Sequence, residues 1–369
     1  MKIVHLTSVH STFDIRIFYK QAISLVNAGH RVTLISTSEN QLPDSYRGVE
    51  LIRVKKYKNK FLRITITCLA IIRKAYKTKA DIYHFHDPEL IPWCMILHLF
   101  GKKIVMDVHE DYKSQIRGNS WIPRILKPLF SYLINLLEWL AVNTFYGIVT
   151  VDEPITEKLL KHNAKIKIIT VRNYPIINKN TLSFVPTLSK YSSKKILFLG
   201  GLMSSRCAPE FIHALEILED LEYSAYVGGN YNQEEILNLL MNSPIHNRVT
   251  FLGRVALEDI EKLLFDSSVS VNLFSNHPNH YGLRSNRLFE SLAAALPVIV
   301  SNFLLTKSFV DEYSCGIAVD PHSPESIAQA LRTLLSNPEI AMEKGLKGRS
   351  AVLKHYSWDS QAEKLNKFY

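Results

Sequence analysis

The sequence has few cysteines and no long uninterrupted apolar run. The four cysteines, Cys68, Cys94, Cys207 and Cys315, are far apart, and none belongs to a C-x-x-C pair, which argues against both a zinc cage and a disulfide framework. The longest apolar stretch, residues 129–142, contains polar residues and falls short of the roughly 20 residues that a membrane-spanning helix needs. We therefore expect no transmembrane segment, and a reducing cytoplasm as the compartment.

The sequence also lacks the composition of a secretory signal or of a disordered chain. The opening residues MKIVHLTSVH run directly into a strand-like segment without a cleavage site, so we expect no signal peptide. Glycine and proline are sparse (14 and 15 residues), and 47% of the 369 residues are hydrophobic against 21% charged. This composition is typical of well-packed globular proteins. The length predicts two domains, because one core seldom accommodates so many residues.

Positive charge is concentrated in the first half of the chain. Residues 1–180 contain 27 lysines and arginines against 14 acidic residues, whereas residues 181–369 contain 17 against 20. A one-sided positive field indicates an anionic partner, either nucleic acid or anionic lipid. A basic, solvated face without a partner is the alternative.

Short apolar, β-branched runs alternate with helical patterns along the chain. The predicted strands of the first half are residues 2–7, 31–37, 81–86, 103–109 and 147–152, and those of the second half are 195–201, 223–229, 248–253, 269–274 and 296–302. Between the first two strands, Ile17, Ala22, Leu25 and Val26 form the apolar face of a helix that stops at Gly29. This βαβα pattern predicts a doubly wound parallel sheet in each half.

The stretch of residues 173–195 interrupts the pattern. It contains two prolines and a cluster of Ser, Thr and Asn, and it is interpreted as the linker between the domains. We expect an N-terminal domain at 1–180, a C-terminal domain at 181–355, and a final helix at 356–369 that packs back on the N-terminal domain. In such sheets ligands bind beyond the carboxyl ends of the strands.

The segment LRSNRLFESLAAALPVIVSN (283–302) has the most informative pattern. Ser285 can cap a helix that begins at Asn286, and Pro297 ends it before a buried strand. Arg287 and Glu290 share one face of the first helical turn. A cation at a positive helix start suits a diphosphate, and a carboxylate can accept hydrogen bonds from a ribose. From the residues alone, local stabilisation of the helix is an equally good interpretation.

The run RLFESLAAALPVIVSN resembles the donor-binding signature of the family 4 retaining glycosyltransferases, whose GT-B fold consists of two Rossmann-like domains facing across a cleft. Further segments are similar to that family: FDIRIFYKQAISLVNAGHRVTLIS, YHFHDPELIP, GKKIVMDVHEDY, ILFLGGL, VTFLGRV and VDPHSPESIAQAL. They cover nearly the whole chain. The resemblance implies an N-terminal domain that binds the acceptor and a C-terminal domain that binds a nucleotide sugar.

The resemblance also implies roles for individual residues. The expected catalytic residue is His109, which in the family reaches the donor sugar. The expected donor-binding residues are Gly201, Arg206, Arg254, Val255, Arg284, Ser285, Asn286, Arg287, Leu288 and Glu290. The expected acceptor-side residues are Asp14, Arg16, His86 and Glu110. For Asp14 and Arg16 a structural ion pair is an equally good interpretation, and for His109 the residues alone favour a locally hydrogen-bonded strand end.

Three departures from the family pattern bear on these roles. Gly282 stands where the family often has a second glutamate, so the donor sugar stays open. Gly201 replaces a phosphate-binding arginine, which leaves Arg206 from that loop with Arg284 and Arg287 as substitutes. The glycine-rich N-terminal loop of the family is replaced by residues 10–16, which include Asp14 and Arg16.

No D-x-D motif follows a predicted strand, which agrees with the metal independence that the resemblance implies. We expect no metal and no cofactor. Cations and helix dipoles then neutralise the departing diphosphate. The resemblance implies front-face transfer, in which the leaving phosphate helps to deprotonate the acceptor hydroxyl.

Two segments of the first half are typical of a membrane interface. Ten basic residues lie between Arg53 and Lys79 around the apolar ITITCLAII, and residues 121–142 combine Trp, Tyr, Leu and Ile with Arg124 and Lys127. Several cations near anionic headgroups, at about 1 kcal/mol each, can hold a protein at a bilayer. The alternative is a core helix and a solvated basic face.

The sequence therefore predicts a metal-independent retaining glycosyltransferase, peripheral to the inner face of the cell membrane. We expect it to move sugar from a nucleotide donor, foremost a UDP-sugar, to a lipid-linked or polysaccharide acceptor in O-antigen, capsule or related polysaccharide biosynthesis. Rival interpretations are a GT-B epimerase or phosphorylase and a nucleic-acid-binding protein. The first lacks extra carboxylates or a cofactor lysine motif, and the second lacks any recognition motif, so no nucleic-acid partner is expected.

Overall fold

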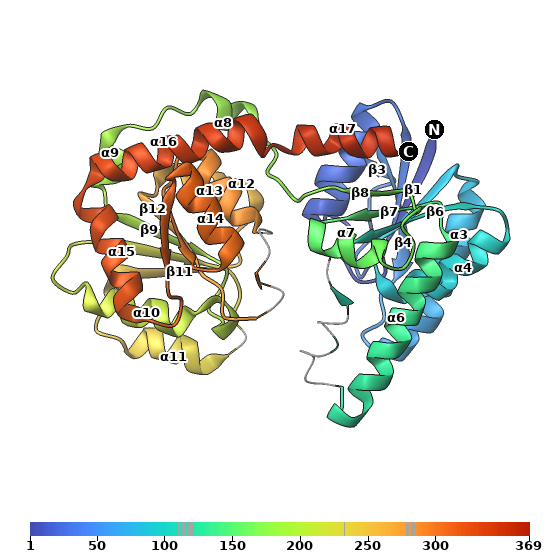
Figure 1. Cartoon of the computed structure of the whole chain (residues 1–369), viewed down its shortest axis with the longest axis horizontal. Helices are drawn as coiled ribbons and strands as arrows, with labels where there is room; N and C mark the ends of the chain where they lie inside the picture. Colours follow the sequence, from blue (N-terminus) through green and yellow to red (C-terminus); the bar gives the residue numbers. More distant parts are fainter. Residues whose placement is uncertain (110, 113–115, 117–121, 232, 278–279, 282–284) are drawn as a thin grey trace. The chain divides into compact units, whose positions relative to one another are not determined.

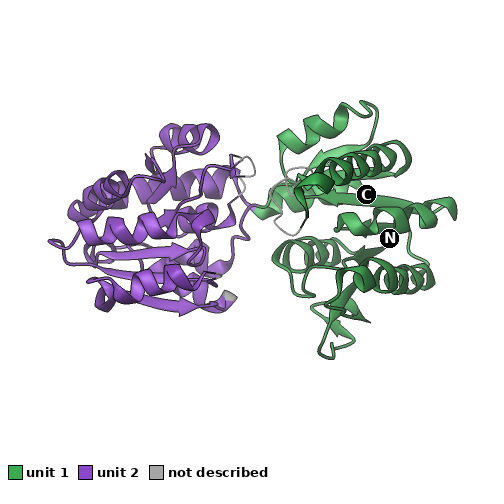
Figure 2. Cartoon of the chain, turned by 90° about the horizontal axis from the view of Figure 1, so that it is seen from below, with its two compact units in different colours: residues 1–173, 358–369 green, residues 174–357 purple. Residues whose placement is uncertain are grey.

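The computed structural model describes all residues except 110, 113–115, 117–121, 232, 278–279 and 282–284. It consists of two compact units, one formed by residues 1–173 and 358–369 and the other by residues 174–357 (Figure 2). Each unit is built on one sheet with helices on both faces (Figure 1). The expected α/β class with two Rossmann-like domains is confirmed.

The first unit contains an eight-stranded sheet with the order β3-β4-β2-β1-β5-β6-β7-β8. Its strands are β1 (Lys2–Leu6), β2 (Arg31–Ser38), β3 (Ser45–Tyr46), β4 (Val49–Lys55), β5 (Ile82–Phe85), β6 (Lys103–Val108), β7 (Gly147–Thr150) and β8 (Ile168–Thr170). The pairs are parallel except for β3, which is antiparallel to β4. The carboxyl ends of β1, β5 and β6 therefore meet at one edge of the sheet.

Side chains alternate between two cores on opposite faces of this sheet. Ile3 packs in one core, and its neighbour Val4 packs in the other. The helical elements are η1 (Ile15–Ala22), α1 (Ile23–Asn27), α2 (Lys60–Leu62), η2 (Arg63–Thr67), α3 (Cys68–Thr78), η3 (Pro88–Leu90), α4 (Ile91–Leu99), η4 (Arg124–Leu126), α6 (Lys127–Thr144), α7 (Glu153–Leu160) and α17 (Trp358–Phe368). The burial of both faces explains the continuous apolar runs of the central strands.

The second unit contains a six-stranded, fully parallel sheet with the order β11-β10-β9-β12-β13-β14. Its strands are β9 (Lys195–Leu199), β10 (Ser224–Gly228), β11 (Val249–Gly253), β12 (Val269–Asn272), β13 (Val298–Ser301) and β14 (Gly316–Val319). The helical elements are α8 (Lys179–Ser183), α9 (Leu188–Ser192), η5 (Ser204–Arg206), α10 (Ala208–Ile217), α11 (Glu234–Asn242), η6 (His246–Arg248), α12 (Leu257–Asp266), α13 (Asn286–Ala293), α14 (Leu304–Tyr313), α15 (Pro324–Ser336) and α16 (Pro338–His355).

The stretch 173–195 is not an interdomain linker, contrary to the sequence interpretation. The boundary lies between Asn173 and Tyr174, so residues 174–195 belong to the second unit. The Lys190 ammonium donates to the carbonyls of Leu264 (3.1 Å) and Ala294 (2.9 Å). Lys190 therefore fixes this stretch to the ends of α12 and α13, and composition alone does not distinguish such a segment from a flexible connection.

The chain returns to the first unit at Trp358, so the expected boundaries at 180 and 355 differ from those of the structure. In α17, the indole of Trp358 donates to the hydroxyl of Ser24 (2.8 Å), and Leu365 and Phe368 are buried in the first unit's core. The final helix is thus an integral part of that core.

Candidate active site

The amino end of α13 places Arg287 and Glu290 on the outer face of the second unit. Ser285 caps the helix, its hydroxyl accepting from the amide of Leu288 (3.4 Å), and the helix begins at Asn286 as predicted. Leu288 and Phe289 are buried. These two apolar side chains fix the rotation of the helix, which leaves Arg287 and Glu290 partly exposed and bound to each other at 2.5 Å.

Arg206 lies close to Arg287 although it belongs to a different loop. It ends the turn η5 after β9, and its guanidinium lies over the ring of Phe274 at 3.9 Å from the centroid. Burial and the nearby charge of Arg287 lower the pKa of Arg206 to about 10. Among the described residues, no carboxylate forms an ion pair with Arg206. Two neighbouring guanidinium groups, of which Arg287 alone pairs with a described carboxylate, leave a net positive charge for an anion.

The loop that carries Arg206 is fixed by tightly packed glycines. Gly201 has φ +82°, and a Cβ built on it lies 2.1 Å from the carbonyl oxygen of Asn230. Its amide donates to the carbonyl of Gly228 (3.0 Å). The steric demand explains why no arginine stands at position 201, because a side chain there has no room.

The loop after β11 separates the two residues expected along the nucleobase. Val255 approaches the glycine turn, since a Cβ on Gly228 lies 2.8 Å from its methyl group. Arg254 is exposed to solvent. A small cavity of about 130 Å³ is lined on one side by Arg287 and Glu290 and on the other by residues of α12 and of the stretch 175–181. It is too small for a whole nucleoside diphosphate, and of the expected donor residues only Arg287 and Glu290 line it within the part of the chain that the structure describes.

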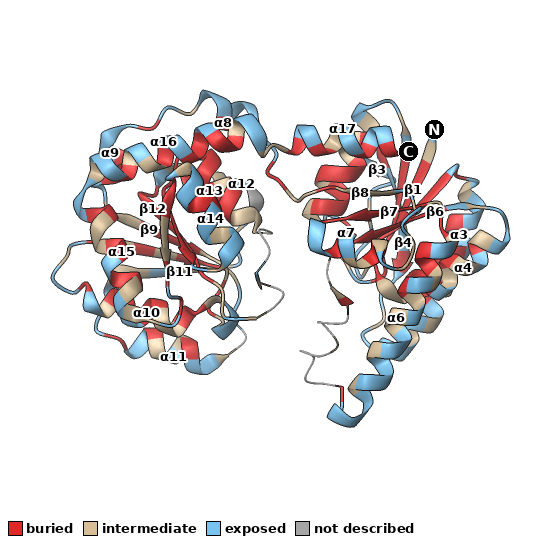
Figure 3. Cartoon of the chain, in the orientation of Figure 1, coloured by how far each residue is buried: buried red, intermediate tan, exposed pale blue. Residues whose placement is uncertain are grey.

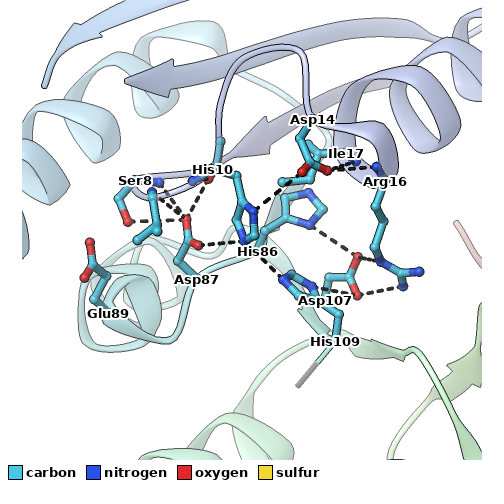
Figure 4. Close-up of polar contacts among 12 residues, drawn as sticks. Ser8, His10, Asp14, Arg16, Ile17, His86, Asp87, Glu89, Asp107 and His109 are labelled. Atoms are coloured by element: carbon cyan, nitrogen blue, oxygen red, sulfur yellow. Dashed lines mark hydrogen bonds and ion pairs between the residues drawn. The ribbon is translucent and has the colours of Figure 1, made fainter. Parts of the chain in front are cut away.

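Asp107, at the carboxyl end of β6, is the centre of a buried polar network in the first unit (Figure 4). Its carboxylate accepts from Arg16 Nε (3.1 Å) and Nη2 (2.9 Å) and from Gln21 Nε2 (2.6 Å). Although burial raises the pKa of Asp107, the charge of Arg16 and hydrogen bonds from His109 and His86 hold it well below its usual range. The carboxylate is therefore ionised in the interior of the unit.

Histidines from three neighbouring strands surround this carboxylate. His86 Nδ1 lies 3.3 Å, and His84 Nε2 3.9 Å, from Asp107 Oδ2, while His109 Nδ1 lies 3.7 Å from Oδ1. His5 on β1 is hydrogen-bonded to His86 at 2.9 Å. Burial lowers the pKa values of His5, His84 and His86, so these three rings are neutral.

A second buried carboxylate, Asp87, holds the loop after β1. It accepts from the hydroxyl of Thr7 (2.7 Å) and the amide of Ser8 (2.6 Å), and it pairs with His10 at 3.3 Å. Figure 4 shows His10 between Asp87 and Asp14. His10 Nε2 lies 3.2 Å from Nε2 of His109, so the two imidazoles meet at the strand ends.

Arg16 does not face a cleft, contrary to its assignment on the acceptor side. Its side chain is only 6% exposed, because Asp107 and the carbonyl of Val171 bind the whole guanidinium. Asp14 caps η1 by accepting from the amides of Arg16 (2.8 Å) and Ile17 (2.9 Å). His86 is also buried and has no surface to offer an acceptor. The burial of both side chains argues against direct acceptor contact, and Arg16 forms a structural ion pair with Asp107 rather than with Asp14.

Two of the expected site residues, Glu110 and Arg284, lie outside the described residues, as does Gly282. Sequence reasoning missed Asp107, Asp87, His5, His10 and His84. A signal was present: in Y-H-F-H and D-V-H the polar residues are two apart, and residues two apart in a strand lie on the same face.

Within the described residues, three groups of side chains lie close enough to hold a metal ion. They are His5, His84 and His86; His86, Asp107 and His109; and Cys207, Glu210 and His322. In the first unit, however, both oxygens of Asp107 are already bound by Arg16, and His5 is hydrogen-bonded to His86. Nevertheless, Nε2 of His5, Nε2 of His84 and Nδ1 of both His86 and His109 are buried without a hydrogen-bond partner among the described residues.

Helix α6 presents an exposed apolar stripe. Leu129, Tyr132, Leu136 and Trp139 recur at helical spacing and are exposed, as is Ile125 in the preceding turn η4. Much of α6 carries the colour of exposed residues in Figure 3. The opposite face packs against the domain core through Ala141 and Val142. Residues 124–144 are long and apolar enough to cross a membrane by length and composition alone, with 17% of the apolar window buried.

Glu138 ties α6 to the first unit. Its buried carboxylate binds the ammonium of Lys158 on α7 at 2.8 Å. One face of α6 is thus fixed to the unit, and the apolar stripe lies on the other. The absence of a transmembrane segment stays a prediction.

Comparisons with known proteins give a consistent result for both units. The family model described as Glycosyltransferase Family 4 matches residues 16–173, and the model described as Glycosyl transferases group 1 matches residues 181–351. An uncharacterised glycosyltransferase of Methanocaldococcus jannaschii is 25% identical over 370 residues, covering 94% of this chain and 91% of the relative.

A second relative matches over a shorter stretch. It is the GDP-mannose-dependent alpha-(1-6)-phosphatidylinositol monomannoside mannosyltransferase of Mycobacterium tuberculosis, 28% identical over 146 residues, or 38% of this chain and 37% of that one. Among solved structures, Anabaena HepE in complex with UDP and glucose superposes with a TM-score of 0.75 and 12% identity, covering 100% of this chain and 98% of the other. That likeness concerns the fold.

Proposed function

The chain belongs to the family 4 glycosyltransferases and is a transferase of GT-B fold; from this premise we propose that it transfers the sugar of a UDP-sugar to a lipid-linked or polysaccharide acceptor in cell-surface glycan synthesis. Arg206 and Arg287 bind the diphosphate at the start of α13, and Glu290 binds the ribose. His109 contacts the donor sugar. Asp14 lies on the acceptor side, beside His10.

The observation that carries the proposal is the proximity of Arg206 and Arg287. Arg206 lies on Phe274, and Arg287 extends from a helix whose next two residues are buried and pairs with Glu290. Since Glu290 is the one carboxylate paired with either arginine among the described residues, the two cations keep an excess positive charge that a bound diphosphate would compensate. The helix start adds the positive end of its dipole.

In the proposed reaction the departing diphosphate is stabilised by these arginines and by the dipole of α13 rather than by a metal ion. Preorganised cations contribute because their orientation is established before the bond breaks. The leaving phosphate oxygen accepts the proton of the acceptor hydroxyl as that oxygen attacks from the same face of the sugar. The configuration at the anomeric carbon is then retained.

The choice of UDP is supported by the fold neighbour with UDP and glucose and opposed by the relative that uses GDP-mannose. A panel of nucleotide sugars in a thermal-denaturation assay separates the two. A donor at 100 times its dissociation constant stabilises the folded state by about 2.7 kcal/mol. UDP-sugars are expected to raise the midpoint and GDP-mannose is not. Stabilisation by GDP-mannose alone contradicts the base assignment, and no stabilisation by any donor contradicts the site.

Arg287→Ala tests the site itself. Titration calorimetry with UDP is expected to show weaker binding in this variant. Arg332→Ala is the matched control, because Arg332 belongs to the same unit and pairs with Asp220 at the surface. Equal UDP affinity of the Arg287→Ala variant and the wild type removes Arg287 from the proposed role.

We further propose that the first unit docks on an anionic bilayer through the apolar stripe of α6. The support is the exposed stripe together with the excess of lysine and arginine in residues 1–180. Apolar side chains enter the interface while nearby cations attract the headgroups. The proposed location is accordingly the cytoplasmic face of the cell membrane.

Co-sedimentation with vesicles of phosphatidylglycerol and phosphatidylcholine tests this docking. The wild type is expected to bind at low salt and to be released at high salt, because screening weakens the cationic contribution. Leu129→Glu with Tyr132→Glu is expected to abolish binding. Val185→Glu, at an exposed apolar position of the second unit, is the matched control. Unchanged binding of the double variant contradicts the proposed surface.

A further inference from the structure

Asp107 and His109 lie two residues apart at the end of β6 and on the same side of the strand (Figure 4). Asp107 is fully buried, whereas the side chain of His109 is 15% exposed. Of the three histidines whose nitrogens face this carboxylate, His84 and His86 are fully buried. Of these three histidines, His109 is therefore the one through which Asp107 can influence a ligand at the surface of the unit.

The surroundings of His109 indicate the position of its proton. Nδ1 of His109 is buried and has no hydrogen-bond partner among the described residues, and the acceptor that it faces is the carboxylate oxygen Oδ1 of Asp107, at 3.7 Å and thus just beyond hydrogen-bond distance. An ionised carboxylate accepts and never donates, which selects the tautomer with hydrogen on Nδ1. Nε2 then carries the lone pair.

The neighbouring His10 fits the same assignment. Its Nε2 lies 3.2 Å from Nε2 of His109, and of two such nitrogens one must donate and the other accept. With hydrogen on Nδ1 of His109, His10 is the donor. The outward nitrogen of His109 is thus an acceptor in the arrangement that the structure shows.

Arg16 and Gln21 prevent the carboxylate from rotating away. Arg16 binds both oxygens, and Gln21 binds Oδ2 at 2.6 Å. A simple structural ion pair requires only Arg16. The additional contact from Gln21 and the three facing histidines indicate a carboxylate whose orientation matters.

We propose that Asp107 is a positioning residue that fixes His109 as the Nδ1–H tautomer and presents Nε2 as an acceptor for a hydroxyl of the donor sugar. This inference rests on the proposed role of His109. Asp107 touches no substrate. It acts by orienting the imidazole.

Nitrogen-15 NMR of histidine-labelled protein tests the tautomer without any substrate. The His109 resonances are identified by their loss in His109→Gln. The wild type is expected to show the Nδ1–H tautomer, and Asp107→Asn is expected to lose it. Glu138→Gln is the matched control, because Glu138 is a buried carboxylate of the same unit that binds Lys158 instead of His109. An Nε2–H tautomer in the wild type overturns the proposal.

Kinetics then separate positioning from general destabilisation. With UDP-glucose as donor and water as acceptor, measured by UDP release, Asp107→Asn is expected to lower kcat about 100-fold or more. In a His109→Gln background the same substitution is expected to have little further effect, since residues that act as a unit are not additive. Multiplication of the two losses in the double variant overturns the proposal.

The double variant Arg16→Met with Asp107→Asn tests whether unfolding, rather than lost positioning of His109, lowers kcat. Removing both charges avoids leaving one of them buried alone. This variant is expected to regain thermal stability but not kcat, and recovery of both overturns the proposal. A wild type that hydrolyses no UDP-sugar contradicts the proposed function instead, and the NMR result still decides the tautomer.

Discussion

The two units differ in whether a buried arginine near the strand ends is paired with a carboxylate. The first unit has the larger excess of lysine and arginine, yet its buried Arg16 is fully neutralised by Asp107. The second unit has slightly more acidic than basic residues, yet Arg206 has no ion-pair partner among the described residues. The net charge of a unit therefore describes its surface as a whole. The charge that a ligand meets depends on which side chains at the site are already paired.

Arg16→Met is expected to have the largest effect, because it leaves the buried carboxylate of Asp107 without its cation. The expected loss of unfolding free energy in the first unit is about 3–5 kcal/mol. Urea denaturation followed by fluorescence measures it. Arg332→Met, which breaks a pair with Asp220 at the surface, is expected to cost far less, because water already solvates both charges. Equal losses in the two variants would contradict the contrast between buried and exposed pairs.

In the second unit, Arg206→Ala is expected to weaken ligand binding rather than to lower stability. Loss of a charge-assisted contact is expected to weaken UDP binding by about 1.5–3 kcal/mol, roughly 10- to 150-fold. The thermal midpoint without ligand is expected to change little, because the substitution also removes the repulsion from Arg287. Calorimetry and thermal denaturation on the same samples test both expectations. A variant that unfolds early but binds UDP normally would reverse the comparison.

Gly201→Ala sharpens the comparison at the backbone of the second unit. The new Cβ would lie 2.1 Å from the carbonyl oxygen of Asn230, so the loop that carries Arg206 has to shift. The expected cost exceeds the roughly 1–2 kcal/mol of a left-handed backbone conformation alone. Gly253→Ala is the matched control, with φ +60° and nothing within 4 Å of the added atom. Thermal melts that show the same cost at both positions would refute the steric explanation.

Asp14→Ala is expected to give the smallest effect, a loss of about 0.5–2 kcal/mol from the cap of η1. Burial tends to raise the pKa of Asp14, but hydrogen bonds from His10 and from the amides of Ile17 and Arg16 lower it to about 2. Because the folded pKa lies below the unfolded one, this stabilisation is complete above about pH 4 and disappears as the pH falls through 2. Urea titrations at pH 6 and pH 3 test whether the difference from wild type narrows in acid.

The pattern of apolar runs predicted the central strands of both sheets because those strands are buried on both faces. All ten predicted strands are found, with ends within two residues of those expected. Four other strands in the described part of the chain were not predicted. In β4 buried and exposed residues alternate, so no continuous run exists, and β3, β8 and β14 have only two to four residues.

The start of α13 could be predicted because a cap, an apolar face and a stop are all local signals. The network around Asp107 could not be predicted in the same way. Arg16 and Asp107 are 91 positions apart, and only the parallel pairing of neighbouring strands brings them together. The prediction that Arg16 faces a cleft was therefore wrong, because the local sequence pattern does not reveal its partner Asp107.

The chain passes from the first unit to the second at residue 174 and returns to the first at residue 358, which matters for chimeras built from this enzyme. A fragment that stops at residue 173 lacks α17, and with it Trp358, Leu365 and Phe368 from the interior of the first unit. Phe368 packs so closely on Gly147 that a methyl group there would lie 2.6 Å from its ring. Exchange of the first unit between related transferases thus requires residues 358–369 to be transferred together with residues 1–173, and the two pieces fit each other only when both come from the same parent.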